Sequence, residues 1–123
     1  MEKKDNFSHA ASVFKVSNIN ESIDFYTKLL QFNLSFSWGN PTEYAVLKKG
    51  GVSIHLSSPT KNHIKEKIQS HIYVFVYDID RIYNQCKNSG IKITKLLNNR
   101  DYKMKDFDIV DLDGNIITFG NGK

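Results

Sequence analysis

Histidines are the side chains of this sequence best suited to chemistry, because imidazole can bind a metal ion or exchange a proton near neutral pH. The four are His9, His55, His63 and His71. His55 and His71 fall in strand-like segments, whereas His63 falls in a polar stretch and is expected to face solvent. The single cysteine, Cys86, has the spacing of a core position on a helix, which favours a small buried hydrophobe, with a reactive thiol as the alternative.

An internal repeat predicts the elements that position these side chains. Residues 16–20 (VSNIN) resemble residues 76–80 (VYDID), 60 positions further along the chain. Each copy lies where an alternating strand pattern meets a helical pattern, with Asn18 or Asp78 as the expected helix N-cap. The repeat therefore predicts an α+β fold of two tandem modules, each with one strand, one helix and three further strands.

The expected elements divide the chain into a first module at about 7–58, a linker at 59–69 and a second module at about 70–121, within one domain over 1–123. The helices are expected over 19–31 and from 79 to Gly90. Gly and Asn residues mark the turns between the later strands. The strands are expected at 9–16, 33–37, 44–48, 52–57, 71–77, 92–97, 107–111 and 116–119.

Strand alternation separates a helix-facing side from an open side in each module. The apolar side chains that are expected to pack under the helices are Phe14, Val16, Ile54, Leu56, Ile72, Val74, Val76, Ile117 and Phe119. The opposite face carries aromatic, hydroxyl and imidazole groups, including His55, His71, Tyr73, Phe75 and Thr118. Such a mixture is typical of a small-molecule site. A purely dimer-forming face is the alternative.

Composition narrows the class of protein. The chain has 123 residues and a net charge of +4, but its arginines are only Arg81 and Arg100 and its lysines are scattered among acids. This favours a solvated surface over a nucleic-acid-binding face. No segment has the length and apolar character of a membrane span or of the core of a secretion signal. With one cysteine and no possible internal disulfide, we expect a cytoplasmic protein.

Two stretches carry a family resemblance: residues 16–26 (VSNINESIDFY) and residues 110–120 (VDLDGNIITFG). With the order of elements, they resemble the glyoxalase/bleomycin-resistance/dioxygenase superfamily, also called vicinal oxygen chelate (VOC) proteins, over nearly the whole chain. The resemblance implies the glyoxalase/bleomycin resistance/dihydroxybiphenyl dioxygenase fold, a curved mixed sheet around an open groove.

Enzymes of that superfamily hold a divalent metal ion with His, Glu or Gln from the first and fourth strands of each module. The repeat maps these four positions to Ala11, His55, His71 and Thr118. Alanine has no ligand atom and a threonine hydroxyl is a poor one, so no metal is favoured. The alternative is a Zn, Ni, Mn or Fe site at His55 and His71, helped by His9, in a lyase, isomerase, thiol transferase or dioxygenase. No carboxylate occupies a mapped position to act as its general base.

The incomplete ligand set makes the chain more similar to the bleomycin-resistance branch, whose members are homodimers that sequester a drug in a groove between subunits. The resemblance implies a metal-free binding protein for a small organic ligand, such as a bleomycin-like antibiotic. The basic net charge argues against cationic bleomycin itself and leaves room for a neutral or anionic ligand. Whether the modules pair within or between chains stays open. The expected ligand-binding residues are Trp38, His55, His71, Tyr73, Phe75, Tyr102, Met104 and Thr118.

Overall fold

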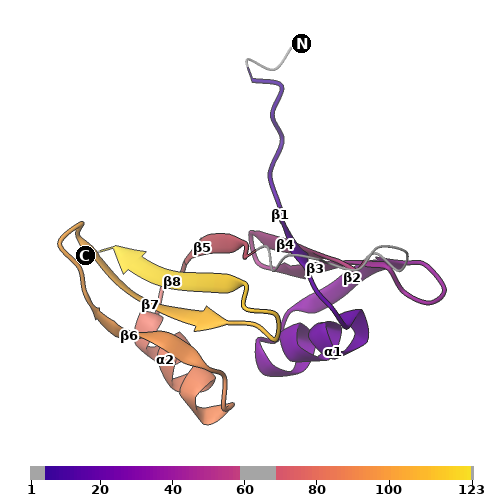
Figure 1. Ribbon diagram of the computed structural model, residues 1–123. Coiled ribbons are helices and arrows are strands. Elements are labelled where there is room, and N and C mark those ends of the chain that lie inside the picture. Colours follow the sequence, from indigo (N-terminus) through magenta and orange to yellow (C-terminus); the bar gives the residue numbers. More distant parts are fainter. Residues whose placement is uncertain (1–4, 59–68, 123) are drawn as a thin grey trace.

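Two mixed sheets of four strands each form the framework of the protein, seen in a computed structural model that describes residues 5–58 and 69–122 (Figure 1). The first sheet has the order β1-β4-β3-β2 and the second β5-β8-β7-β6. In both, the first strand runs parallel to the fourth and the other pairs are antiparallel. The predicted α+β fold with two equivalent modules is confirmed.

The elements follow one another in the predicted order. The first module consists of β1 (Ser12–Lys15), α1 (Ile19–Asp24), a π-helical turn η1 (Phe25–Leu29), β2 (Asn33–Trp38), β3 (Tyr44–Lys49) and β4 (Val52–Ser57). The second consists of β5 (His71–Phe75), α2 (Ile79–Asn88), β6 (Ile93–Asn99), β7 (Met104–Val110) and β8 (Ile116–Gly122).

The helices begin at the predicted caps. The Asn18 side chain accepts a hydrogen bond from the amide of Glu21 at 3.1 Å, and the Asp78 side chain accepts one from the amide of Arg81 at 3.2 Å. Each bond satisfies a donor that the first helical turn leaves unpaired. The first helix widens into η1 and ends before Gln31, whose φ of 60° lies in the left-handed region.

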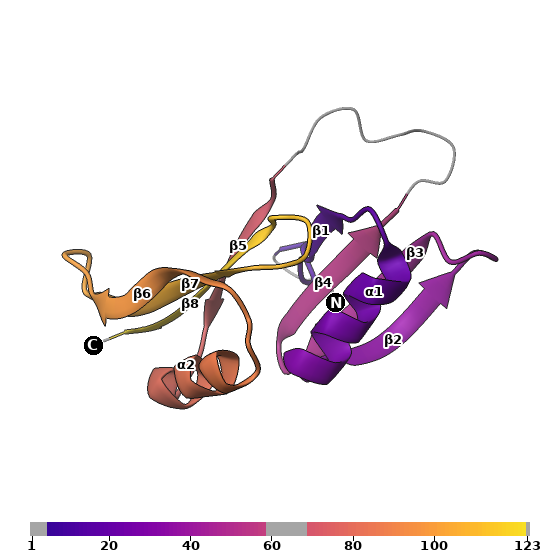
Figure 2. The ribbon, with the colours of Figure 1, turned by 60° about the horizontal axis from the view of Figure 1, so that its bottom comes forward.

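Each helix covers one face of its own sheet, and both helices lie on the same side of the molecule (Figure 2). The strand side chains under the helices form the core, as alternation predicts, and Tyr83 of α2 packs edge-on against Phe107 of β7 with ring centroids 4.9 Å apart. The opposite faces of the two sheets therefore form one open side of the chain. The fully or almost fully buried members of this core include Phe14, Val16, Ile54, Leu56, Val74, Ile117 and Phe119.

A buried polar network joins the two modules. The Tyr26 hydroxyl at the end of the first helix donates to Asp111, at the end of β7, at 2.8 Å. Burial, followed by the neighbouring Asp111 carboxylate, raises the pKa of Tyr26 well above its usual value. Asn115 donates to the backbone oxygen of Lys15 at 3.1 Å, and Asp113 accepts from the amide of Ser17 at 3.0 Å. The turn before β8 thus anchors the second module to the first.

Several boundaries differ from those expected; β6 and β8, for example, run on to Asn99 and Gly122. The first strand starts at Ser12, because residues 5–11 extend away from the sheets and are exposed (Figure 1). The fifth strand ends at Phe75. The seventh starts at Met104, three residues early, so that Asp106 lies within the sheet. Apart from Gln69, the expected linker at 59–69, with His63, lies outside the described residues. Within the described chain, no helix is long and apolar enough to span a membrane.

Candidate functional site

The open side of the first module carries an aromatic edge. Trp38 and Phe36 of β2 lie on the same face as Tyr44 and Val46 of β3, their register partners, and 60% of the Trp38 side chain is exposed. Phe36, Trp38 and Tyr44 border a shallow hollow of about 410 Å³ that Ser57 also lines. His55 of β4 is half-buried, and its Nδ1 lies 2.6 Å from the Tyr44 hydroxyl. The imidazole therefore orients a phenol beside the exposed indole.

A buried carboxylate organises the open side of the second module. Asp106 of β7 has no solvent exposure and accepts hydrogen bonds from the hydroxyls of Tyr73 at 2.9 Å and Tyr102 at 2.6 Å. It also pairs with Nε of Arg100 at 2.8 Å and with Nζ of Lys95 at 3.7 Å. Burial alone would raise the pKa of Asp106, but the hydrogen bonds from Tyr102, Arg100 and Tyr73 hold it below the usual value. The carboxylate is thus ionised and fully partnered.

The Tyr73 ring reaches Asp106 by crossing the neighbouring strand at Gly120. Tyr73 lies in β5 and Asp106 in β7, with β8 between them. A Cβ on Gly120 would lie 2.6 Å from Cε1 and Cζ of Tyr73, closer than any carbon atoms pack. Burial, followed by the Asp106 hydrogen bond, raises the pKa of Tyr73 above its ordinary range. Phe75, 73% exposed, packs on this ring with centroids 4.9 Å apart.

A second chain of hydrogen bonds starts at His71. Its Nε2 lies 2.7 Å from Oγ1 of Thr118, which lies 2.6 Å from Oδ1 of Asp108. A carboxylate only accepts, so the Thr118 hydroxyl donates to Asp108 and accepts from the protonated Nε2 of His71. The chain therefore makes Nε2 of His71 the donor and leaves Nδ1 of this exposed residue without a hydrogen-bond partner among residues 5–58 and 69–122.

The four positions to which the internal repeat assigns possible metal ligands do not fit a metal centre. Ala11 offers a methyl group, Thr118 is hydrogen-bonded on both sides, and one nitrogen of each of His55 and His71 is already partnered. His9 is exposed on the N-terminal segment, where its Nδ1 lies 2.6 Å from the Ser8 hydroxyl. Among residues 5–58 and 69–122, no group of three or more His, Cys, Asp or Glu side chains is placed to hold a metal ion.

The structure places the expected binding residues on the open faces of their modules. Trp38 and His55 belong to the first module, and the others to the second, where Met104 is half-buried beside Gly122 and Tyr102 is 56% exposed. Sequence reasoning missed Asp106, Asp108 and Tyr44. The alternation of residues 104–109 (MKDFDI) could have placed the two aspartates, because in a strand Asp106 and Asp108 face away from the apolar Phe107 and Ile109 and hence toward the open side.

Cys86 is buried, and burial raises its pKa to about 11, so the thiol is not poised to react. The expectation of a small buried hydrophobe is confirmed. The residues that remain available on the open side are aromatic rings, phenols, imidazoles and satisfied carboxylates. This set can stack on a flat molecule and hydrogen-bond to its edges.

Comparison with known proteins gives the class of protein. The sequence profile of the Glyoxalase/Bleomycin resistance protein/Dioxygenase superfamily matches residues 7–119. The chain therefore belongs to this superfamily. A search of curated proteins finds no match.

Solved structures share the fold at low sequence identity. TioX from Micromonospora sp. ML1 superposes with a TM-score of 0.82 at 16% identity, covering 95% of this chain and 100% of TioX. The bleomycin resistance determinant encoded on the transposon Tn5 superposes with a TM-score of 0.78 at 16% identity, covering 95% of this chain and 99% of the determinant. An integron cassette protein from the mobile metagenome of the Halifax Harbour sewage outfall superposes with a TM-score of 0.77 at 18% identity, covering 93% of this chain and 97% of the cassette protein.

Proposed function

We propose that this protein binds a small, partly aromatic organic molecule on its open side without a metal ion, and that it acts by sequestration rather than by chemistry. The observation that carries the proposal is the set of exposed rings, Trp38, Phe75 and Tyr102, backed by phenols and imidazoles already held by hydrogen bonds. Rings at fixed positions lose little conformational entropy when a ligand stacks on them.

The Asp106 cluster supports this reading because it fixes the side chains before any ligand arrives. Tyr73 and Tyr102 share one carboxylate oxygen, so neither phenol is free to rotate away. Arg100 is held at the same time by Asp106 and by a backbone oxygen of that residue at 3.1 Å. A preorganised site of this kind is what tight binding requires, while no group in it is positioned as a nucleophile.

A second copy of the chain completes the site in this proposal. The open side leaves Phe36, Trp38, Phe75 and Leu96 more than half exposed, which is unusual for the surface of a monomer. A homodimer would cover these side chains and form a groove between subunits. The extended segment 5–11, which carries the almost fully exposed Phe7, is available for contact with the partner.

Charge favours a neutral or anionic ligand over cationic bleomycin. The net charge is +4, and Asp106 is already neutralised by Arg100 and approached by Lys95. An antibiotic with a planar, uncharged ring system fits these properties, which makes drug resistance the proposed role. One of the similar structures is named as a bleomycin resistance determinant. A cytoplasmic location is part of the proposal, in keeping with the lone buried Cys86.

Fluorescence of Trp38, the single tryptophan, tests the proposal with two probes, the neutral bicyclic 2-naphthol and metal-free bleomycin. We expect saturable quenching by 2-naphthol and weaker quenching by bleomycin. Because one stacked ring contributes about 0.5–1.5 kcal/mol, Tyr102→Leu should weaken naphthol binding by about 2- to 12-fold. Leu112→Ala, which truncates an exposed side chain in the β7–β8 turn, is the control. Equal affinities of the two variants would refute the assignment.

A further inference from the structure

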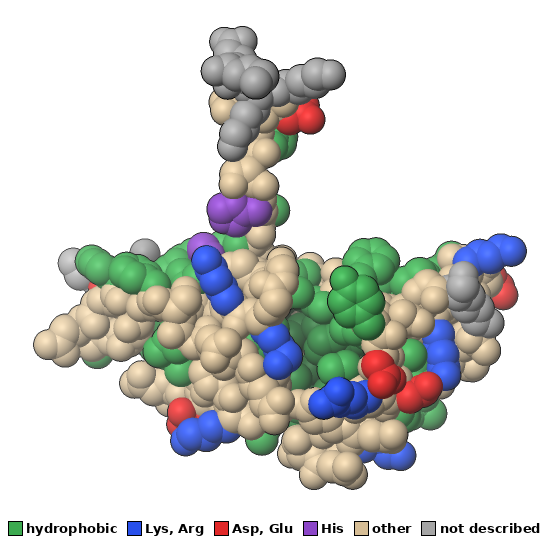
Figure 3. Space-filling view, turned by 180° about the vertical axis from the view of Figure 1, so that it is seen from behind, with side chains coloured by type: hydrophobic (Ala, Val, Ile, Leu, Met, Phe, Trp, Pro, Cys, Tyr) green, Lys and Arg blue, Asp and Glu red, His purple; other side chains and the backbone are tan. Residues whose placement is uncertain are grey.

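A cleft at the junction of the two modules lies outside the proposed groove. It has a volume of about 400 Å³, within the range of small-molecule pockets. Its walls come from the end of the first helix, the turn between β3 and β4, strand β5 and helix α2. In the space-filling view, hydrophobic side chains gather around a hollow between the modules, with basic and acidic side chains at its margin (Figure 3).

The interior of the cleft is apolar. Leu30 and Phe32 line it from the first module, and Val74, Ile82 and Phe119 line it from the second. Gln85 of α2 donates from Nε2 to the backbone oxygen of Leu29 at 3.3 Å, which ties the two walls together. The cleft is thus a defined hollow between linked elements, with a hydrocarbon surface that a ligand would desolvate.

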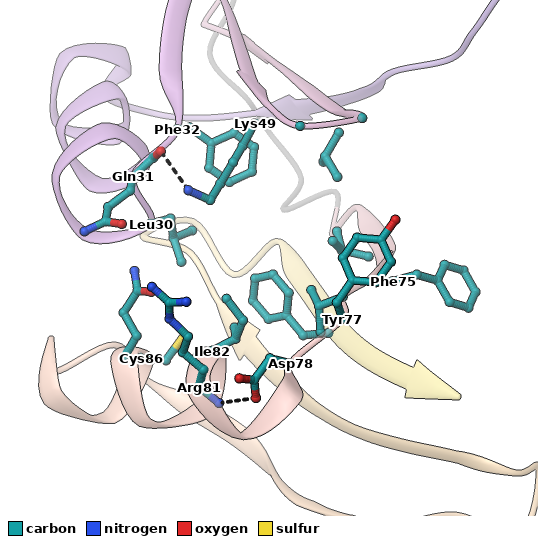
Figure 4. Close-up of a pocket in the computed structure, with 17 residues that line it drawn as sticks. Leu30, Gln31, Phe32, Lys49, Phe75, Tyr77, Asp78, Arg81, Ile82 and Cys86 are labelled. Carbon is teal, nitrogen blue, oxygen red and sulfur yellow. Dashed lines mark hydrogen bonds between the residues drawn. The ribbon is translucent and has the colours of Figure 1, made fainter. Parts of the chain in front are cut away.

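Two cationic side chains approach the mouth of the cleft from opposite modules (Figure 4). Lys49, at the end of β3, points toward the end of the first helix and donates to the Gln31 backbone oxygen at 3.2 Å. Arg81, in the first turn of α2, reaches up from the other wall. Its guanidinium has no hydrogen-bond or ion-pair partner within residues 5–58 and 69–122.

The charges around the mouth leave an excess of positive charge. Asp78 is the carboxylate among the described lining residues, and its Oδ1 already caps helix α2. Lys49 contacts a neutral carbonyl rather than an acid. An anion between Lys49 and Arg81 would satisfy the guanidinium and relieve the repulsion between the two cations.

We propose that this cleft binds a small organic carboxylate, with its acid group between Lys49 and Arg81 and its hydrocarbon body over Leu30, Ile82 and Phe119. The site is separate from the aromatic groove: of the groove residues, only Phe75 also lines the cleft. An occupied cleft would contact both modules at once. Its ligand would therefore stabilise their junction, which the Tyr26–Asp111 network already supports from another direction.

Decanoate and decylammonium provide a matched pair of probes, since they share a hydrocarbon chain and carry opposite charges. Each would be titrated below its micelle concentration into ¹⁵N-labelled full-length protein. We expect decanoate to shift the amide signals of Gly50 and Ile82, which line the cleft, and to leave that of Tyr102 unchanged. Decylammonium should bind at least several-fold more weakly.

Substitutions locate the charge. Arg81→Ala and Lys49→Ala should each weaken decanoate binding by about two- to fivefold, and together by about tenfold. Lys48→Ala and Lys87→Ala are matched controls: Lys48 points to the opposite face of β3, and Lys87 lies over the Tyr83 ring of α2. Both should leave the affinity unchanged.

Three outcomes would overturn the proposal: no shift at the cleft amides, equal affinity for the two probes, or an equal loss in the control variants. Trp38→Leu separates this site from the groove, because it should weaken the binding of 2-naphthol measured by calorimetry and leave decanoate binding intact. Loss of decanoate binding in Trp38→Leu would place the acid in the groove and also count against the cleft.

Discussion

Gly120→Ala should damage the open side out of proportion to the single methyl group that it adds. The new Cβ would lie 2.6 Å from Cε1 and Cζ of Tyr73, so the ring must move off β8. Overpacking of this kind costs about 1–3 kcal/mol. Loss of the 2.9 Å hydrogen bond to Asp106 adds about 1.5 kcal/mol, because the acceptor is charged. We therefore expect the free energy of unfolding to fall by about 2.5–4.5 kcal/mol.

Urea denaturation measures this loss. With a slope of about 2 kcal/mol per molar urea, the middle of the usual range, the midpoint should fall by about 1–2 M. Gly122→Ala is the matched control on the same strand and face, since its Cβ would meet only the Met104 sulfur, at 3.9 Å. In a Tyr73→Ala background, Gly120→Ala should cost little. Equal midpoints for the two glycine variants would show that the Tyr73 ring does not cross β8 as described.

Two further substitutions test the polar networks. Because the pKa of Asp106 is lowered in the folded chain, its contribution to stability is complete above the usual carboxyl pKa of about 4 and is lost as the pH falls through the folded-state pKa. Asp106→Asn should lower the free energy of unfolding by about 2–3 kcal/mol at neutral pH and should reduce the loss of stability that the native protein shows as the pH falls below about 4. The same loss of stability in acid for both proteins would contradict a lowered pKa of Asp106. Tyr26→Phe removes a donor from the buried Asp111 carboxylate, so the free energy of unfolding measured in urea should fall by about 1–3 kcal/mol. Tyr83→Phe is the control and should change it by almost nothing, because the Tyr83 hydroxyl has no partner in the described chain. Similar losses in the two variants would contradict the role of the Tyr26–Asp111 hydrogen bond in joining the modules.

The architecture was predictable because local signals agree along the whole chain. The caps Asn18 and Asp78 repeat at the same place in each half and both make the expected hydrogen bonds. The alternation of apolar and polar residues in β4 and β5 correctly separated the core residues from those of the open face. This pattern is reliable because a shift of the strand by one residue would move every apolar side chain from the core to the open face. The fold and the orientation of His55 and His71 follow from these signals.

The charge network was not predictable in the same way. The segment before Phe107 is polar and reads as a loop, so β7 was expected to start too late and Asp106 fell outside it. A buried aspartate is tolerable only because Tyr73, Tyr102 and Arg100 converge on it, and this convergence depends on strand order, not on local sequence. Contacts between modules, such as Tyr26 with Asp111, depend likewise on packing across the junction.

In the proposed function, the open side binds an organic ligand without a metal ion. Calorimetry on chelator-stripped protein tests it most directly, with 2-naphthol and with Zn²⁺, Ni²⁺, Mn²⁺ and Fe²⁺ as separate titrants. We expect 2-naphthol to bind without any metal and the metal ions to bind weakly, if at all, with no difference in the His55→Ala/His71→Ala variant. Tight binding of one metal ion per site that this variant abolishes, together with no heat from 2-naphthol, would contradict the proposed function and indicate a metalloenzyme.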